Sequence, residues 1–166
     1  MKRLPCSTSL ILLTNANIII NIEYTMKKIV FANCGAGNQG KSSSVKEVYH
    51  LLNSKYKTKL LIDGADVKAT IQINGVLVGL ESQGDPYSRM FQSLDEFVSK
   101  GCDIIVCACR SSGGTRRKVE SLANLGYQIV WAQNDRTKDS TLYSHLNNMY
   151  ARKIVDLILD RIAGKF

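Results

Sequence analysis

The sequence predicts an α/β protein, organised as a three-layer αβα sandwich around a mostly parallel sheet. Two observations lead to this fold class. Short apolar segments alternate along the chain with longer segments whose apolar residues recur at helical spacing. Several of the short segments are apolar on both faces, as strands buried between two layers of helices should be. We therefore expect five strands in a mostly parallel sheet, plus one antiparallel strand contributed by a hairpin.

The composition indicates a single globular domain. The chain has 166 residues, 45% of them hydrophobic, and no apolar run is long enough to cross a membrane. Its five cysteines form no Cys-x-x-Cys pair, which argues against a disulfide framework or a zinc site and favours a reducing, cytoplasmic location. The net charge of +8 would suit a polyanionic partner, but no basic block typical of nucleic-acid binding is present. A nucleic-acid partner is therefore an open alternative without a supporting motif.

The start of the sequence stands apart from this domain. An apolar run that begins at Leu10 resembles part of a secretory signal, but asparagines interrupt it and no small-residue cleavage pattern follows. Met26 directly precedes the first expected strand. We expect residues 1–25 to be a poorly ordered extension without a role in the fold, and residues 26–166 to form the domain.

The first strand and the first helix of the domain flank a glycine-rich loop. The apolar segment 28–33 predicts the strand, and helical spacing of apolar residues predicts a helix over 41–54. Gly35, Gly37 and Gly40 allow the backbone between them to turn its N–H groups inward, which forms a concave site for an anion. The N-terminus of the helix adds partial positive charge at the same place.

The side chains at the end of this loop suit a phosphate group. Lys41 supplies a mobile cation for terminal phosphates, and the Ser42 hydroxyl is an expected ligand of Mg²⁺. A turn that only connected the strand to the helix would have no need for this adjacent pair. The candidate phosphate-binding residues are Gly35, Ala36, Gly37, Asn38, Gln39, Gly40, Lys41, Ser42 and Ser43.

A hairpin follows in the middle of the sequence. Residues 60–62 predict a short buried strand that ends at Asp63. Alternating apolar residues over 67–73 predict a half-exposed strand, and the apolar segment 76–80 predicts one that is buried on both faces. Asn74-Gly75 between them is typical of a two-residue turn.

The remaining elements continue the alternation of strands and helices. The pattern predicts helices over 87–100 and 141–163, and a further helix after the loop at 111–115. Strands are expected over 103–109 and 127–132. Because ligands of parallel sheets bind at the carboxyl ends of strands, the polar loops that follow these strands should meet at the glycine-rich loop.

The spacing of this loop matches a known motif. Gly35, four further residues and Gly40-Lys41-Ser42 fit the Walker A pattern, with the required strand before it and helix after it. Over about residues 27–163 the chain resembles the P-loop NTPases. Within them it resembles the division of small-molecule kinases and GTPases, in which the acid-bearing strand lies next to the Walker A strand. The resemblance implies the P-loop NTPase fold, Mg²⁺ as cofactor and a nucleoside triphosphate as substrate.

The resemblance also suggests which acidic residues would bind the metal ion or accept a proton. A Walker B strand ends in an acid that holds the metal through water, and Glu81 after the apolar segment 76–80 is the best match. Asp63 is the second candidate for the metal. Kinases with a similar layout place acids there that bind the acceptor, and such an acid could accept the proton of a hydroxyl. The alternatives are a solvated loop acid at Glu81 and a turn rich in Asp and Gly at Asp63.

Two further segments bear on the nucleotide. Glu81-Ser-Gln-Gly84-Asp85 is similar to the Asp-x-x-Gly switch of Ras-like GTPases, which makes Asp85 a candidate catalytic residue. The guanine-reading Asn-Lys-x-Asp motif is absent, and Gln133-Asn134-Asp135-Arg136 stands in its place. ATP is therefore expected rather than GTP, with Asn134 as a contact to the adenine edge. ParA-like ATPases are excluded because Ala36 stands where they have an additional lysine.

Arginines flank the loop at 111–115, namely Arg110, Arg116 and Arg117. One of them could reach the γ-phosphate and neutralise charge in the transition state, and the alternative is an ordinary basic helix start. The candidate catalytic residues are Lys41, Asp63, Asp85 and Arg116. We expect phosphoryl transfer from ATP to an unidentified small-molecule or protein acceptor, or ATP hydrolysis. The alternative is a nucleotide-dependent switch or assembly ATPase that acts through a protein or nucleic-acid partner.

Overall fold

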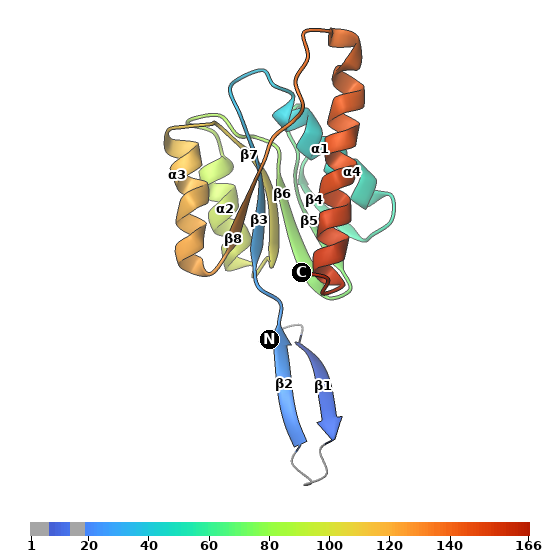
Figure 1. Ribbon diagram of the computed structural model, residues 1–166. Coiled ribbons are helices and arrows are strands. Elements are labelled where there is room, and N and C mark those ends of the chain that lie inside the picture. The colour runs from blue at the N-terminus through green and yellow to red at the C-terminus, as the bar shows by residue number, and fades with distance from the viewer. Residues whose placement is uncertain (1–6, 14–18) are drawn as a thin grey trace.

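A computed structural model describes residues 7–13 and 19–166. The chain from residue 29 onward folds into an α/β domain whose six-stranded mixed sheet carries helices on both faces (Figure 1). The strands are β3 (Ile29–Cys34), β4 (Thr58–Ile62), β5 (Lys68–Ile73), β6 (Val76–Glu81), β7 (Ile104–Cys109) and β8 (Gln128–Ala132). The helices are α1 (Lys41–Asn53), α2 (Met90–Ser99), α3 (Gly114–Ser121) and α4 (Tyr143–Ile162), with 3-10 turns η1 (Leu122–Leu125) and η2 (Ser140–Leu142).

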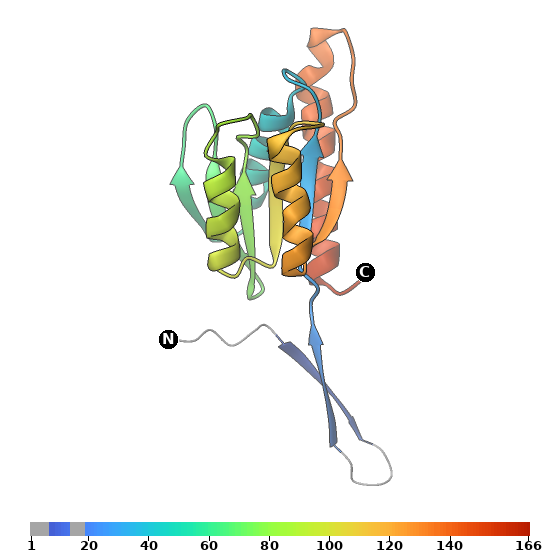
Figure 2. The same cartoon turned by 90° about the vertical axis from the view of Figure 1, so that its left-hand side faces the viewer.

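The helices form two layers that bury separate apolar clusters. Side chains of β3 alternate between them: Ile29 and Phe31 pack in the cluster with α1 and α4, whereas Val30 and Ala32 pack in the one with α2 and α3. Figure 2 shows α2 and α3 side by side on one face of the sheet, with α4 behind it. The predicted three-layer α/β arrangement is therefore present.

The strand order is β4-β5-β6-β7-β3-β8. The pairs β6/β7, β7/β3 and β3/β8 are parallel, and β5 is antiparallel to both β4 and β6. Five strands thus share one direction and β5 runs opposite to them. The expected neighbourhood of the acid-bearing strand is not found, because β7 lies between β3 and β6. Every side chain of β7 is buried, as its wholly apolar sequence requires at the centre of a sheet.

The exposure of two strands is the reverse of the expectation. β4 was predicted to be buried, but it is an edge strand in which Leu60 and Ile62 are 39% and 38% exposed. The sequence predicts β5 to be half exposed, yet only Gln72 is exposed, and Lys68 on the same face is covered by α2. The buried ammonium of Lys68 pairs with Glu96 of α2 at 2.6 Å. Apolar alternation alone does not reveal which strand occupies an edge.

The turn between β5 and β6 confirms the predicted hairpin. Asn74 and Gly75 have φ values of 48° and 84°, the left-handed pair that a two-residue hairpin turn of this kind needs. This turn pairs Ile73 with Val76 and sets the register of the two strands.

The N-terminal segment forms a separate antiparallel pair. β1 (Ser7–Leu13) and β2 (Ile19–Thr25) make a two-stranded sheet that shares no ladder with the six-stranded one. The expectation of poor order over 1–25 falls partly on residues 1–6 and 14–18, which lie outside the described residues. Among the helices that the structure describes, none has the length and apolar character needed to span a membrane.

Candidate functional site

The glycine-rich loop forms a pocket at the carboxyl end of β3. Asn38 and Gly40 adopt left-handed φ values of 55° and 70°, which turn the chain sharply into α1. The helix begins without a side-chain cap and without an acid in its first turn. Its first N–H groups and its positive end are therefore available to an anion. The pocket measures about 210 Å³ and is lined by Asn38, Gln39, Gly40, Lys41, Ser42, Ser43, Gly84 and Asp85.

Gly40 is required by both its backbone angle and its surroundings. A Cβ atom at this position would lie 2.6 Å from Oδ1 of Asn147 on α4. Together with the φ of 70°, this means that any other residue would strain the backbone and displace the Asn147 side chain from its hydrogen bonds with Ser44 and Asn134. The loop is thus fitted against the helix that follows β8.

Lys41 lies inside the pocket as a largely buried cation. Its side chain is 7% exposed, and its ammonium donates a hydrogen bond to the carbonyl oxygen of Ala36 within the loop. Burial lowers the pKa of Lys41, and the positive charge of Arg110 lowers it further. A buried ammonium that faces a second cation is an arrangement that an incoming anion would stabilise.

Arg110 is a second cation beside the pocket, paired with the lining residue Asp85. Its guanidinium lies against the loop at Gly37, where a Cβ atom would come within 2.5 Å of Nη1. Nη2 forms an ion pair with Asp85 at 2.8 Å. The buried Nε makes no hydrogen bond within the described part of the chain. Arg110 therefore keeps an unpaired buried donor, and Asp85 is the acid that the structure brings to the loop.

Glu81, by contrast, is fully engaged by its own surroundings. Its carboxylate is completely buried, and each oxygen accepts two hydrogen bonds. Arg89 donates to both oxygens at 3.0 Å, Ser93 donates to one at 2.5 Å, and the backbone N–H of Gln83 donates to the other at 2.9 Å. This carboxylate anchors the segment after β6 to α2, so the geometry does not support the predicted metal ligand there.

The predicted acid Asp63 lies away from the loop. It follows β4, and three strands separate β4 from β3. The next residues are held to α1, because the Lys46 ammonium donates to the carbonyl oxygens of Gly64 and Ala65 at 3.2 and 3.0 Å. Asp63 is exposed and lines neither pocket beside the glycine-rich loop.

Arg116, the predicted catalytic arginine, packs on a different surface. Its guanidinium stacks on the ring of Trp131 in β8, 4.1 Å from the ring centre. Nε pairs with Glu120 at 2.9 Å, and Nη1 donates to the sulfur of Cys34 at 3.4 Å. The arginine that lies beside the glycine-rich loop is Arg110, which directly follows β7, and not Arg116.

Asn134 is a half-buried connector rather than an exposed amide. Its Nδ2 donates to Ser44 Oγ at 2.5 Å, to Asn147 Oδ1 at 3.0 Å and to the carbonyl oxygen of Gln39 at 3.3 Å. Its Oδ1 accepts a hydrogen bond from Asn33 Nδ2 at 2.8 Å. The amide thus joins β3, α1, α4 and the loop, and its Nδ2 donates to protein acceptors rather than to the base edge that the sequence suggested.

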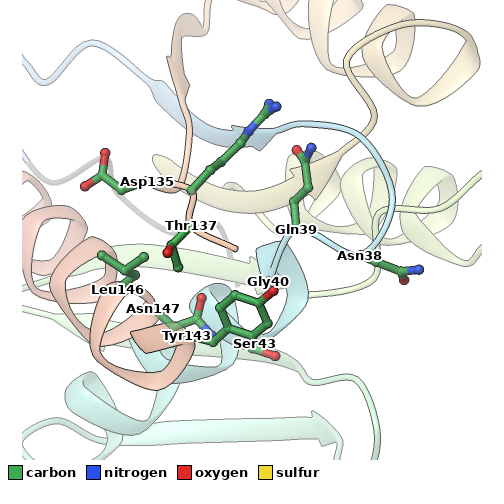
Figure 3. Close-up of a pocket in the computed structure, with 10 residues that line it drawn as sticks. Asn38, Gln39, Gly40, Ser43, Asp135, Thr137, Tyr143, Leu146 and Asn147 are labelled. Atoms are coloured by element: carbon green, nitrogen blue, oxygen red, sulfur yellow. The ribbon is translucent and has the colours of Figure 1, made fainter. Parts of the chain in front are cut away.

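A second pocket adjoins the first along the glycine-rich loop (Figure 3). It measures about 370 Å³ and lies between the loop, the segment after β8 and the start of α4. The ring of Tyr143, which is 51% exposed, reaches from α4 toward the start of α1. The lining residues are Asn38, Gln39, Gly40, Ser43, Asp135, Arg136, Thr137, Tyr143, Leu146 and Asn147. Asn38, Gln39, Gly40 and Ser43 line both pockets, so a ligand could extend from one into the other.

The residues of the site could bind a divalent cation only if phosphate oxygens of a ligand and water completed its coordination shell. No cluster of three or more His, Cys, Asp or Glu side chains suited to a metal occurs among the described residues. Ser42 and Asp85 line the same pocket and offer a hydroxyl and a carboxylate. Mg²⁺ commonly takes one or two such protein groups and completes its shell with water and phosphate oxygens.

Three residues of the site were missed by pattern reasoning. Tyr143 and Asn147 are four residues apart on α4 and face the loop together, which the helical spacing could have indicated. Asn33 lies inside an apolar strand, where a buried amide signals a polar partner.

Comparison of the chain with protein-family models, curated proteins and solved structures finds no match in any of the three.

Proposed function

We propose that this chain is a P-loop protein that binds ATP with Mg²⁺ and transfers its γ-phosphate, either to an acceptor in a kinase-like reaction or to water. One observation carries the proposal: a small cationic pocket and a larger one with an aromatic wall share four residues of the glycine-rich loop. A nucleoside triphosphate has the same two parts, a polyanion and a planar base. The four buried free thiols of the described chain agree with a reducing, cytoplasmic setting.

The phosphate chain would occupy the smaller pocket. The uncapped first turn of α1, with Lys41, Ser42 and Ser43, lines it, and Arg110 lies beside it through its ion pair with Asp85. These groups are fixed before any ligand arrives, so little reorganisation is needed to stabilise charge on a transferring phosphate. When Mg²⁺ is bound, Ser42 would hold it, and it would supply further charge neutralisation at the phosphates.

The base would occupy the larger pocket. The Tyr143 ring offers a stacking face, and Asp135 and Thr137 offer polar groups at the rim. Adenine remains the expected base because the guanine-reading motif is absent after β8. Asn134 would act indirectly, since it holds the loop and α4 in their mutual positions.

The transfer step requires an in-line nucleophile and a route for its proton. An oxygen of the acceptor or of water would form a bond to the γ-phosphorus while the bond to the β,γ-bridging oxygen breaks, and ADP would leave. Asp85 is 66% exposed on its side chain and lies in the phosphate pocket, so it could take the proton of a hydroxyl nucleophile. Lys41 and Arg110 would balance the negative charge on the leaving phosphate.

The Asp85–Arg110 ion pair also favours a second candidate, a nucleotide-dependent switch. A γ-phosphate would compete with Asp85 for the guanidinium of Arg110, because both anions need the same donors. Release of Asp85 would free the segment between β6 and α2, which a partner could read. Slow hydrolysis without an acceptor, and partner binding only in the triphosphate state, would distinguish the switch from the kinase.

The test is nucleotide binding by the intact chain and by two lysine variants. Titration calorimetry and thermal unfolding with a non-hydrolysable ATP analogue and Mg²⁺ should show stabilisation of the wild type, about 2.7 kcal/mol at a hundredfold excess over Kd. Lys41→Ala should weaken binding by about tenfold or more, whereas Lys46→Ala, on the same helix but bound to carbonyl oxygens of another loop, should not. A wild type that no nucleoside triphosphate stabilises, or a Lys41→Ala variant with unchanged affinity, contradicts the proposal.

A further inference from the structure

A third pocket lies beside the phosphate pocket. It measures about 570 Å³ and is formed by the segment between β6 and α2 together with the start of α3. Its lining residues are Pro86, Tyr87, Ser88, Phe91, Gly114, Thr115 and Arg117. The two sites touch at two points. Asp85 of the phosphate pocket precedes Pro86, and the backbone N–H of Arg110 donates to Thr115 Oγ1 at 3.0 Å. A ligand in the third pocket would therefore lie next to the phosphates.

Tyr87 has an unusual conformation for its position. Its φ is 61°, in the left-handed region that bulky residues rarely adopt, and the residue is completely exposed. Its hydroxyl makes no hydrogen bond within the part of the chain that the structure describes. The fold thus gains nothing from holding an aromatic ring in water at a strained backbone position. Such a residue indicates a binding role, because the ring would find its contacts in a ligand.

Arg117 supplies an unpaired cation at the same pocket. Among the charged residues near the start of α3, Arg116 pairs with Glu120 and Lys118 pairs with Asp95 at 2.6 Å. The guanidinium of Arg117 is exposed and has no ion pair among the described residues. Phe91 adds an apolar wall. The pocket therefore offers aromatic surfaces and a planar cation, the pair of features that recognise a flat ring carrying an anionic group.

We propose that this pocket binds one nucleotide unit, with its base against the Tyr87 ring and its phosphate at Arg117. The volume lies within the range of small-molecule sites, about 300–1,000 Å³. The same unit could come from a free nucleoside monophosphate or from a single strand of nucleic acid, and the net charge of +8 is compatible with both. Use of the pocket as the acceptor site rests on the proposed function, whereas nucleotide binding at Tyr87 does not.

Calorimetric titrations with two kinds of probe distinguish a free nucleotide from a nucleic-acid strand as the ligand of this pocket. The probes are the four nucleoside 5′-monophosphates and a short single-stranded DNA of mixed sequence, each added in the presence of a saturating non-hydrolysable ATP analogue and Mg²⁺. Tyr87→Ala should weaken binding of the active probe by about fivefold to more than a hundredfold, the range for loss of one stacking aromatic. Tyr87→Phe should retain the affinity because stacking needs the ring only, and Arg117→Ala should weaken it.

A control variant and the pattern of outcomes keep this inference distinct from the proposed function. Lys118→Ala, which removes a neighbouring cation that pairs with Asp95 and does not line this pocket, should leave probe binding unchanged. If only the DNA binds in a Tyr87-dependent way, the site is assigned to a nucleic-acid strand. If only the monophosphates bind in this way, the site is assigned to a free nucleotide. If the ATP analogue fails to bind but a probe still binds through Tyr87, the proposed function fails and this site stands. Absence of binding by every probe, or wild-type affinity in both Tyr87→Ala and Arg117→Ala, overturns it.

Discussion

Arg110 and Asp85 form an ion pair, 2.8 Å between Nη2 and Oδ1, at the edge of the pocket made by the glycine-rich loop, which Asp85 lines. The two residues come from the ends of β7 and β6, neighbouring parallel strands at the centre of the sheet. Their side chains are 34% and 66% exposed, so solvent screens the pair and its contribution to stability is about 0–1 kcal/mol. The pair therefore contributes little to the stability of the fold. Its significance lies in the charged groups that it places next to the pocket.

Replacement of Arg110 should impair nucleotide chemistry and leave the fold intact. Arg110→Ala removes a cation from the pocket, and we expect ATP turnover to fall by about 10²–10³-fold, as when a charge-stabilising donor is lost. The free energy of unfolding should change by less than about 1 kcal/mol. Steady-state assays and urea unfolding measure the two effects.

Arg116→Ala is the matched control for Arg110→Ala. Its guanidinium stacks on Trp131, outside the pocket, so we expect turnover close to that of the wild type. Equal losses of turnover in the two variants would remove the distinction that the structure makes between these arginines.

Lys41 gives the ligand-free protein a pH-dependent stability. Burial, and then the charge of Arg110, lowers the pKa of Lys41 in the folded protein below its ordinary value of 10.5. Between the lowered pKa and 10.5 the unfolded chain binds more protons, so the contribution of Lys41 to the free energy of unfolding rises with pH in this window. Below the lowered pKa the folded protein carries the full penalty of the buried charge.

Lys41→Met should therefore stabilise the ligand-free protein. We expect a higher unfolding temperature than in the wild type at neutral pH, with the difference shrinking as the pH approaches 10.5. Thermal unfolding across a pH series, with Lys46→Met as the control on the same helix, measures this. A Lys41→Met variant that is less stable than the wild type at neutral pH would show that the ammonium stabilises the empty pocket.

The two acids after β6 should separate into a structural and a functional residue. Glu81→Gln weakens a buried pair with Arg89, whose side chain is 24% exposed, so we expect a loss of about 2–3 kcal/mol, somewhat below the ~3–5 kcal/mol of a fully buried pair. Asp85→Asn should cost less than about 1 kcal/mol but reduce turnover strongly. Urea unfolding and turnover of both variants provide the comparison. The reverse pattern, an inactive but stable Glu81→Gln protein, would return the metal-binding role to Glu81.

Local features of the fold could be predicted because their causes are local. The glycine-rich loop and α1 follow from glycine positions and helical spacing, and the β5–β6 turn follows from Asn74-Gly75, whose left-handed angles few other pairs adopt. The edge position of β4 could not be predicted in this way. Its apolar residues are the same ones that a central strand would carry, and only the strand order decides which neighbours cover them.

The functional side chains illustrate the same limit. Arg110 and Arg116 both follow β7 in sequence, and no local pattern separates them. Arg110 directly follows the strand and meets Gly37 of the loop, whereas Arg116 lies in the first turn of α3 and meets Trp131 of the edge strand. Likewise, Glu81 ends its strand as a Walker B acid would. Its carboxylate is nevertheless occupied by Arg89, which approaches from the start of the next helix. Contacts between distant segments assign these roles.

The hydrogen bonds of Asn134 lead to the final prediction. Asn134→Ala would leave the buried amide of Asn33 and the hydroxyl of Ser44 without this partner, and we expect a loss of about 1–3 kcal/mol. The affinity for ATP should fall because the loop and α4 are no longer joined, but the ratio of ATP to GTP affinity should stay the same. Tyr143→Ala should also weaken the binding of both ATP and GTP. Its effect on the free energy of unfolding should be small because the residue is 51% exposed. Chemical unfolding and competition titrations measure these changes. A stable Asn134→Ala protein with an altered ATP to GTP ratio would mean that this amide reads the base after all.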